Sequence, residues 1–336
     1  MQTEAKATKL DLADSHSHHW GVILAGGDGQ RLLPLTRRIA GDDRPKQFCA
    51  IMDGATLLRQ TRRRVSRMLT PWRTLLALTR THERFYADEV AGLPSSSLLI
   101  QPCNRGTAPA ILYSLMRVRE MDPGAIVAFF PSDHHFTDDE ALASDIAAAF
   151  AAAAFRSESV VLLGITPESP EVGYGWIEPG AILTSQLGDR IYQVNRFWEK
   201  PSTDLALSLM ERGCLWNSFI MVGHVCAFLR LIRHTLPHLV ESFECIRPSF
   251  GTTAERNALS DLYSEIDATC FSQRVLSAHP YALAVLCGKG LGWSDLGEPS
   301  RVFSVLERKG VKTEWNFDSG RGEERSAGAG GGRASS

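Results

Sequence analysis

The sequence predicts an α/β fold with one mixed, mostly parallel central sheet. Short apolar runs rich in Val, Ile, Leu and Phe alternate with longer amphipathic segments. Such alternation is typical of buried parallel strands whose connecting helices cover both faces of a sheet. The chain has 336 residues, of which 44% are hydrophobic, so it can bury a sizeable core. Ligands of such sheets bind outside the carboxyl ends of the strands, where functional residues are therefore expected.

Strands and helices are expected to follow one another through the first half of the chain. The apolar runs expected to be strands are 20–25, 74–79, 97–100, 125–130 and 159–165. The amphipathic stretches expected to be helices are 56–68, 108–119 and 138–155, the last rich in the strong helix former Ala. After Gly164 the expected elements are shorter: strands around 176–177, 191–198 and 219–222, and helices over 225–234 and 253–263. The second half should extend the same sheet.

Composition and charge exclude several kinds of partner. A formal net charge of -2 provides no basic excess for a nucleic-acid backbone, so no nucleic acid is expected. No run approaches the roughly 18 apolar residues of a membrane helix, and the N-terminus lacks an apolar signal core, so no membrane contact is expected. Seven cysteines without a Cys-x-x-Cys pair indicate reduced thiols in a cytoplasmic protein. Residues 1–19, with His16, His18 and His19 solvated, and 317–336 are expected to be disordered.

A glycine-rich loop follows the first expected strand, where residues 24–36 read LAGGDGQRLLPLT. Glycines let backbone N–H groups approach a triphosphate, and Arg31 adds a forked donor for phosphate oxygens. The loop is neither a Walker loop nor a Gly-x-Gly-x-x-Gly dinucleotide motif. Downstream, Lys46 in the run RPKQF could neutralise a leaving pyrophosphate. Taken alone, the glycines could serve only a turn, and Lys46 could be an ordinary surface lysine.

A carboxylate is expected near the same phosphates. Asp133 follows the buried run 125–130, so it should emerge at the carboxyl end of a strand. A hard carboxylate there suits Mg²⁺, although Asp133 also precedes a helical stretch and could be a helix cap.

These motifs together carry a family resemblance. The loop LAGGDGQRLLPLT followed by PKQF resembles the signature of the sugar-1-phosphate nucleotidyltransferases, and the PKQF form is most similar to mannose-1-phosphate guanylyltransferases. Further matches occur in order over about residues 20 to 300: QPCNRGTAPA, PSDH, GYGWIE, FWEKP, WNS and WSDLG. The resemblance implies a single Rossmann-like, glycosyltransferase-A-like domain over 20–316. Its nucleotide half would span about 20–165 and its sugar-binding half about 166–316.

The resemblance also implies a reaction and a role for each matching residue. A nucleoside triphosphate and a hexose-1-phosphate would react in the presence of Mg²⁺ and release pyrophosphate. With GTP and mannose-1-phosphate as the substrates, the product would be GDP-mannose. The implied nucleotide-binding residues are Leu24, Ala25, Gly26, Gly27, Gly29, Arg31, Gln101, Gly106 and Thr107, and the implied catalytic residues are Arg31, Lys46 and Asp133. The implied sugar-phosphate contacts are Gly175, Glu199, Lys200 and Asn217, and the implied Mg²⁺ ligands are Asp133 and Asp295.

Several residues depart from the guanylyltransferase pattern. Gly106 stands where asparagine is common, Ser132 where alanine is usual, Trp176 where Tyr is common and Phe219 where glycine is frequent. Because these changes touch the base and sugar pockets, transfer of UMP, dTMP or CMP to another sugar phosphate is an alternative. A non-catalytic homologue that senses sugar nucleotides is another, although the retained charged residues argue against it. The sequence leaves open whether the chain is a homo-oligomer.

Overall fold

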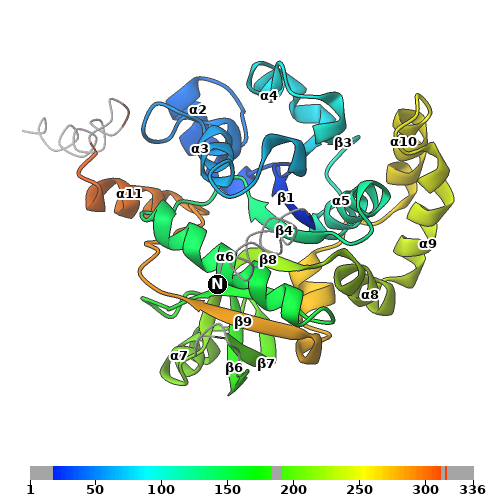
Figure 1. The fold of residues 1–336 in the computed structure, drawn as a ribbon. Coiled ribbons are helices and arrows are strands. Elements are labelled where there is room, and N and C mark those ends of the chain that lie inside the picture. Colours follow the sequence, from blue (N-terminus) through cyan, green and yellow to red (C-terminus); the bar gives the residue numbers. More distant parts are fainter. Residues whose placement is uncertain (1–17, 184–190, 312–314, 316–336) are drawn as a thin grey trace, which may run out of the picture.

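The computed structural model describes residues 18–183, 191–311 and 315. Within these ranges one nine-stranded sheet has the order β3-β2-β1-β4-β8-β5-β9-β7-β6 (Figure 1). The strands are β1 (His19–Leu24), β2 (Thr74–Thr79), β3 (Leu98–Gln101), β4 (Ile126–Pro131), β5 (Val160–Ile165), β6 (Gly175–Ile182), β7 (Ile191–Glu199), β8 (Leu215–His224) and β9 (Leu283–Gly288).

The sheet is mixed, as expected. Strand β1 is parallel to β2 and β4, β2 is parallel to β3, and β5 is parallel to β9. The antiparallel strand β8 lies between β4 and β5, and β7 runs antiparallel to β6 and β9. The carboxyl ends of β1 to β4 therefore point the same way, and the loops that follow them converge at one edge of the sheet.

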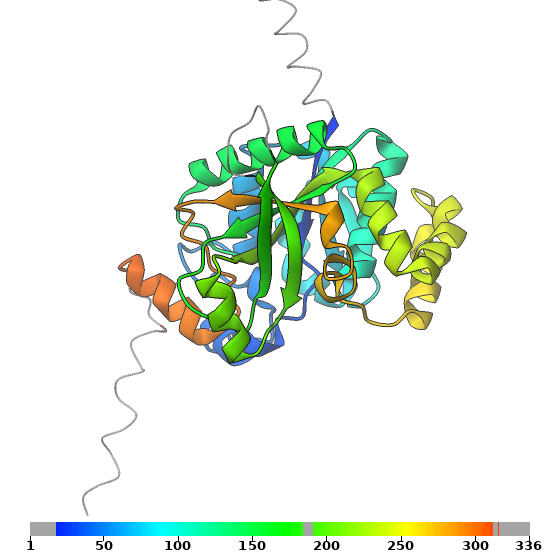
Figure 2. The ribbon, with the colours of Figure 1, turned by 90° about the horizontal axis from the view of Figure 1, so that it is seen from below.

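Helices cover both faces of the sheet. One hydrophobic core contains side chains of α5, α8, α9 and α10, and a second contains side chains of α3, α4, α6 and α7. Figures 1 and 2 show α11 at one end of the molecule and α9 with α10 at the other. The helices are α2 (Leu33–Ala40), α3 (Leu57–Val65), α4 (Glu83–Val90), α5 (Thr107–Met121), α6 (Asp139–Phe155), α7 (Thr203–Glu211), α8 (Val225–Thr235), α9 (Pro237–Ile246), α10 (Glu255–Glu265) and α11 (Pro299–Arg308).

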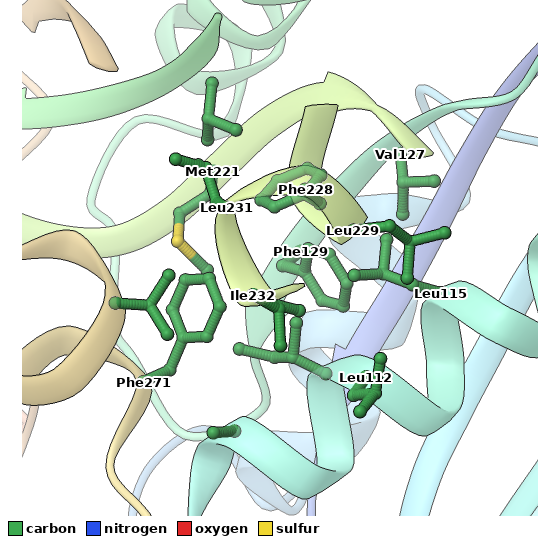
Figure 3. Packing of buried hydrophobic residues seen from close by; sticks show 14 of the residues in the cluster. Leu112, Leu115, Val127, Phe129, Met221, Phe228, Leu229, Leu231, Ile232 and Phe271 are labelled. Atoms are coloured by element: carbon green, nitrogen blue, oxygen red, sulfur yellow. The ribbon is translucent and has the colours of Figure 1, made fainter. Parts of the chain in front are cut away.

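Alternating side chains of β4 pack into the two cores on opposite faces of the sheet. Val127 and Phe129 belong to one core, while Ala128 and Phe130 belong to the other, because successive strand residues point to opposite faces. Phe129 meets Phe228 of α8 edge to face with ring centroids 5.2 Å apart (Figure 3). Burying each such ring contributes about 1.5–3 kcal/mol, so β4 is anchored on both faces beside the loop that follows it.

The expected strands and helices are all present, with ends that differ by a few residues. Helix α6 begins after Asp138, whose side chain accepts from the backbone N–H groups of Glu140 and Ala141. Strand β9 and helices α2, α4, α7, α9 and α11 were not predicted. The apolar run of β9 is buried on both sides, and such a short run cannot be told from a buried helical segment by periodicity.

The folded body begins earlier than expected at the N-terminus. His19 opens β1 and its ring stacks on Phe150 with centroids 4.1 Å apart, while His18 Nδ1 lies 2.8 Å from Asp122 Oδ1. The expected arm therefore extends too far at His19, which lies in β1, whereas the His18 side chain is 55% exposed, as expected for a solvated histidine. His16 and the expected tail 317–336 lie outside the described residues. No helix in the described ranges is both long and apolar enough to span a bilayer.

A third hydrophobic cluster joins distant parts of the chain. Leu32 and Leu35 pack with Cys49, Ile51, Met52 and Leu57, and with Leu296, Val302, Val305 and Leu306 near the end of the described chain. Helix α11 is thereby held beside the glycine-rich loop.

Candidate active site

The glycine-rich loop leaves the carboxyl end of β1 and is fixed by side chains from elsewhere. Gln47 Nε2 donates to the carbonyls of Ala25 at 3.2 Å and Gly27 at 2.7 Å, and Thr79 Oγ1 donates to the carbonyl of Gly26 at 3.0 Å. Because these bonds occupy the loop carbonyls, the loop presents a preformed backbone to a ligand.

Glycine occupies positions 26, 27 and 29 of the loop for different physical reasons. A Cβ at Gly26 would lie 2.7 Å from Thr79 Oγ1, so only glycine permits that approach. Gly29 has a φ of 60°, a left-handed conformation that glycine adopts without steric cost. A Cβ at Gly27 would meet no protein atom within 4 Å, so its absence leaves open space beside the cavity that Gly27 lines.

Two adjoining cavities lie along this loop and share Asp133 and His134. The first, of about 350 Å³, is lined among others by Leu24, Gly26, Gly27, Gln101, Gly106, Thr107, Glu199 and Phe219. The second, of about 410 Å³, is lined by Gly29, Gln30, Arg31, Leu32, Lys46, Asp295 and Gly297 in addition to the shared pair. The fold therefore brings most of the predicted site residues to one place.

Lys46 and Asp133 form an ion pair where the two cavities meet. The Lys46 ammonium lies 3.2 Å from Asp133 Oδ2 and also donates to the backbone carbonyls of Asp295 and Leu296. Lys46 is only 9% exposed, whereas the Asp133 side chain is 25% exposed. Lys46 is thus a held charge and not a mobile surface lysine, and Asp133 keeps an open side toward both cavities.

Asp295 lies in the second cavity but its carboxylate is already engaged. Oδ1 accepts from the Tyr174 hydroxyl at 3.1 Å and the Gly297 N–H at 2.8 Å, and both oxygens accept from Arg301. Burial alone would raise the pKa of Asp295, but the charges of Lys46 and Arg301 together with the Gly297 N–H lower it. Among the described residues no group of three or more His, Cys, Asp or Glu side chains is placed to hold a metal ion. A Mg²⁺ ion at this cavity would meet Asp133, which is paired with Lys46, and Asp295, which would have to share its oxygens with Arg301.

The implied base-binding residues stand together at the carboxyl end of β3 and the start of α5. The Tyr263 hydroxyl donates to Gln101 Oε1 at 3.0 Å, which leaves the amide NH₂ group of this buried side chain as the donor near the loop. Gly106 has a φ of 82°, and a Cβ there would lie 2.5 Å from the Thr269 carbonyl oxygen. Gly106 departs from the family pattern, in which asparagine is common. The structure requires glycine here because the segment around Thr269 approaches too closely for a side chain. The Thr107 hydroxyl accepts from the Phe271 N–H at 2.8 Å and fixes the same segment.

The implied sugar contacts are close together except for one. A Cβ at Gly175 would lie 3.1 Å from Glu199 Oε2 and 3.4 Å from Asn217 Cβ, so these three residues adjoin. Burial raises the pKa of Glu199, with the neighbouring Lys200 opposing the shift. The Lys200 side chain is 60% exposed, and its ammonium lies 3.6 Å from Glu199 Oε1. The structure thus places Lys200 at the rim and connects it to the cavity through Glu199.

Arg31 lies at the edge of the second cavity. Its side chain is 59% exposed and its guanidinium is 3.5 Å from Glu298. Among the described ion pairs it reaches Glu298 and not Asp133, although Arg31 and Asp133 line the same cavity.

His134 is neutral in this arrangement. The Trp293 indole N–H donates to His134 Nδ1 at 3.2 Å, and burial lowers the His134 pKa. Its Nε2 lies 3.8 Å from Asp133 Oδ1. This separation is too long for a hydrogen bond, so His134 lies beside Asp133 without a direct bond to it.

Sequence reasoning missed four residues that shape the site: Gln47, Tyr263, Trp293 and Arg301. Gln47 and Trp293 lie inside the quoted motifs PKQF and WSDLG, so the motifs themselves pointed at them. Tyr263 and Arg301 lie in helices whose local patterns contain no signal, and only their tertiary contacts identify them.

The fold and the site together define an α/β protein with a glycine-rich loop at the carboxyl end of its first strand, beside two adjoining cavities. The model of the family described as nucleotidyl transferase matches residues 20–309. The chain belongs to the nucleotidyl transferase family.

Curated relatives have related names. The chain is 30% identical over 294 residues to the alginate biosynthesis protein AlgA of Pseudomonas syringae pv. tomato, covering 84% of this chain and 57% of that protein. It is 31% identical over 300 residues to a mannose-1-phosphate guanylyltransferase of Sinorhizobium fredii, covering 85% of this chain and 55% of that protein. The chain thus spans little more than half the length of these relatives.

Solved structures share the fold. A structure named mannose-1-phosphate geranyltransferase from Thermus thermophilus has a TM-score of 0.73 and 30% identity, covering 88% of this chain and 80% of that one. A Helicobacter pylori structure named mannose-6-phosphate isomerase has a TM-score of 0.63 at 19% identity, covering 82% of this chain and 99% of that one, and shows the fold alone.

Proposed function

We propose that the chain transfers a nucleotidyl group from a nucleoside triphosphate to a hexose-1-phosphate and releases pyrophosphate, with GTP and mannose-1-phosphate as the preferred pair. The observation that carries the proposal is the ion pair between buried Lys46 and partly exposed Asp133, which lies where the cavity along the glycine-rich loop meets the cavity of Arg31 and Asp295. The names of the relatives support guanylyl transfer to mannose-1-phosphate.

In the proposed reaction, a phosphate oxygen of the sugar-1-phosphate attacks the α-phosphorus of the triphosphate. The new P–O bond forms in line with the bond to the departing pyrophosphate, so no covalent protein nucleophile is needed. Loop N–H groups and Lys46 would stabilise negative charge that grows on the phosphates, and the held geometry of both would require little reorganisation. The neutral His134 is not assigned a proton-transfer role.

Mg²⁺ is part of the proposal. A bound Mg²⁺ ion would neutralise phosphate charge and orient phosphate oxygens. Asp133 is the ligand that the geometry supports, because it is partly open to both cavities. Asp295 would contribute only beside its bonds from Arg301, Tyr174 and Gly297.

The proposed setting is the cytoplasm, which the free thiols of all seven cysteines support. Whether the chain forms a homo-oligomer is a question for solution measurement.

The deciding experiment is a turnover panel with pyrophosphate release as the readout. GTP with mannose-1-phosphate is compared with UTP or dTTP with glucose-1-phosphate, in the presence of Mg²⁺. Greater kcat/KM for the first pair is expected. Preference for another pair would replace the base and sugar assignments, and no turnover of any pair would favour a sensor of sugar nucleotides.

A further inference from the structure

Phe219 has a backbone conformation that bulky residues rarely adopt. Its φ is 61°, in the left-handed region favoured by glycine. Such outliers gather at functional sites and persist only where the surrounding structure imposes them. Lys200, beside the same site, also has a positive φ of 49°.

The surroundings of Phe219 impose this conformation through a bulge in β8. Leu162 of β5 pairs with Met221, but Gly164, two residues on, pairs with Asn217, so β8 carries extra residues between these points. Polar side chains fix the bulge: Asn217 Oδ1 accepts from the Phe219 N–H at 3.1 Å, and Ser218 Oγ donates to the Leu163 carbonyl at 2.6 Å. The left-handed backbone at position 219 is therefore set by the bulge and its polar bonds and not by the phenylalanine ring.

The bulge places Phe219 in the lining of the first cavity, together with Glu199, one of the implied sugar contacts. Among the strands of the second half, β7 contributes Glu199 to the lining and β8 contributes Phe219. Phe219 is half-buried and also packs against the core formed with α5 and α8. Bulges re-aim side chains next to active sites, and glycine would satisfy this backbone without strain while leaving the ring's volume empty. Phe219 therefore combines a strained backbone with a place in the cavity lining.

We propose that Phe219 is a specificity-determining residue whose ring closes the sugar end of the cavity. The site would then take a hexose-1-phosphate that is unsubstituted on the hydroxyl facing β8 and reject one that carries an added group there. This inference rests on the proposed function, because it assigns the sugar preference of that same site.

The test compares mannose-1-phosphate with its four mono-O-methyl derivatives, methylated at C2, C3, C4 or C6. Phe219→Gly removes the ring and suits the left-handed backbone, so it should fold. For the derivative whose methyl group faces β8, the ratio of its kcat/KM to that of mannose-1-phosphate should be about 10-fold or more higher in Phe219→Gly than in the parent. One methylene in a tight pocket typically changes substrate discrimination by this much. Phe219→Asn, smaller and tolerant of the left-handed region, should raise the same ratio.

Phe219→Leu is the matched control, since it retains an apolar side chain of substantial size and the backbone strain. It should keep the parent's ratios more closely than the glycine variant does. Unchanged ratios for all four derivatives in both Phe219→Gly and Phe219→Asn would overturn the inference while leaving the proposed function intact. A parent protein that turns over no sugar-1-phosphate would instead overturn the proposed function, so the two failures are distinguishable.

Discussion

Arg301 Nη1 lies 2.9 Å from Oδ1 and 3.0 Å from Oδ2 of Asp295. The same guanidinium donates through Nη2 to Glu171 at 2.6 Å and lies over the Tyr174 ring at 4.3 Å. Gly173 makes room for it, because a Cβ there would lie 2.8 Å from Arg301 Nη2. Helix α11 is thereby connected to the segment before β6 and to the loop that carries Asp295.

Removing this guanidinium should destabilise the protein strongly. Arg301→Ala leaves the Asp295 carboxylate, whose side chain is 14% exposed, without its cationic partner, and breaking such a pair costs about 3–5 kcal/mol. Arg301→Lys should recover only part of the loss, because one ammonium cannot reproduce the planar fork. Urea unfolding measures the difference in free energy.

A control lies on the same helix. Arg308 pairs with Glu168 at 3.3 Å, and both side chains are more than half exposed. Arg308→Ala should therefore change the free energy of unfolding by no more than about 1 kcal/mol. Equal losses in Arg301→Ala and Arg308→Ala would show that the buried contact to Asp295 adds nothing.

The free energy of unfolding should depend on pH in the acid range because the pKa of Asp295 is lowered in the folded protein. A carboxylate with a folded-state pKa below its ordinary value of 3.8 stabilises the fold above that pH, and this stabilisation is lost as the pH falls through the lowered pKa. The stability advantage of the parent over Asp295→Asn should thus be constant at neutral pH and shrink below about pH 4. Unfolding curves of both proteins across this range test it, and an advantage that grows on acidification would contradict the assignment.

Asp133→Asn and Asp295→Asn should fail in different ways. The neutral amide binds Mg²⁺ poorly, so Asp133→Asn should lose most turnover and require more Mg²⁺. Its stability should fall less than that of Asp295→Asn, because the Asp133 side chain is partly exposed and Lys46 keeps its bonds to two backbone carbonyls. Asp295→Asn should lose stability as well, since Arg301 loses its charged partner. Mg²⁺ titrations of activity alongside melting temperatures separate the two. Parent-like turnover of both variants in saturating Mg²⁺ would exclude these carboxylates from the metal site.

The two lysines should differ in kinetic effect. Lys46 is buried beside Asp133, so Lys46→Ala should mainly lower kcat, as expected for a charge used in the transition state. Lys200 lies at the rim beside Glu199, so Lys200→Ala should raise KM for the sugar-1-phosphate more than for the triphosphate. Varying each substrate in turn measures both constants, and an unchanged sugar-phosphate KM would remove Lys200 from the site.

Local sequence patterns sufficed for the strands of the first half of the fold, although not for helices α2 and α4. The runs at β1, β2, β4 and β5 are apolar along their length because these strands are buried on both faces, and the glycine-rich loop directly after β1 is visible in the same stretch. The motif spacing also predicted which residues would meet, and Lys46, Asp133 and Asp295 do line one cavity. The buried strands and the glycine-rich loop depend on neighbours in the sequence, so the sequence by itself determined them, whereas the meeting of Lys46, Asp133 and Asp295 was implied only by the family resemblance.

Only the tertiary structure decided how the charges of the site are paired. Arg301, Tyr174 and Lys46 reach Asp295 from three separate segments, and no periodicity encodes such contacts. The local sequence around Phe219 likewise does not predict its positive φ, because this conformation follows from a register shift between β5 and β8. Long-range pairing and strand register are properties of the packed sheet, and they determine which predicted residues are free to meet a ligand.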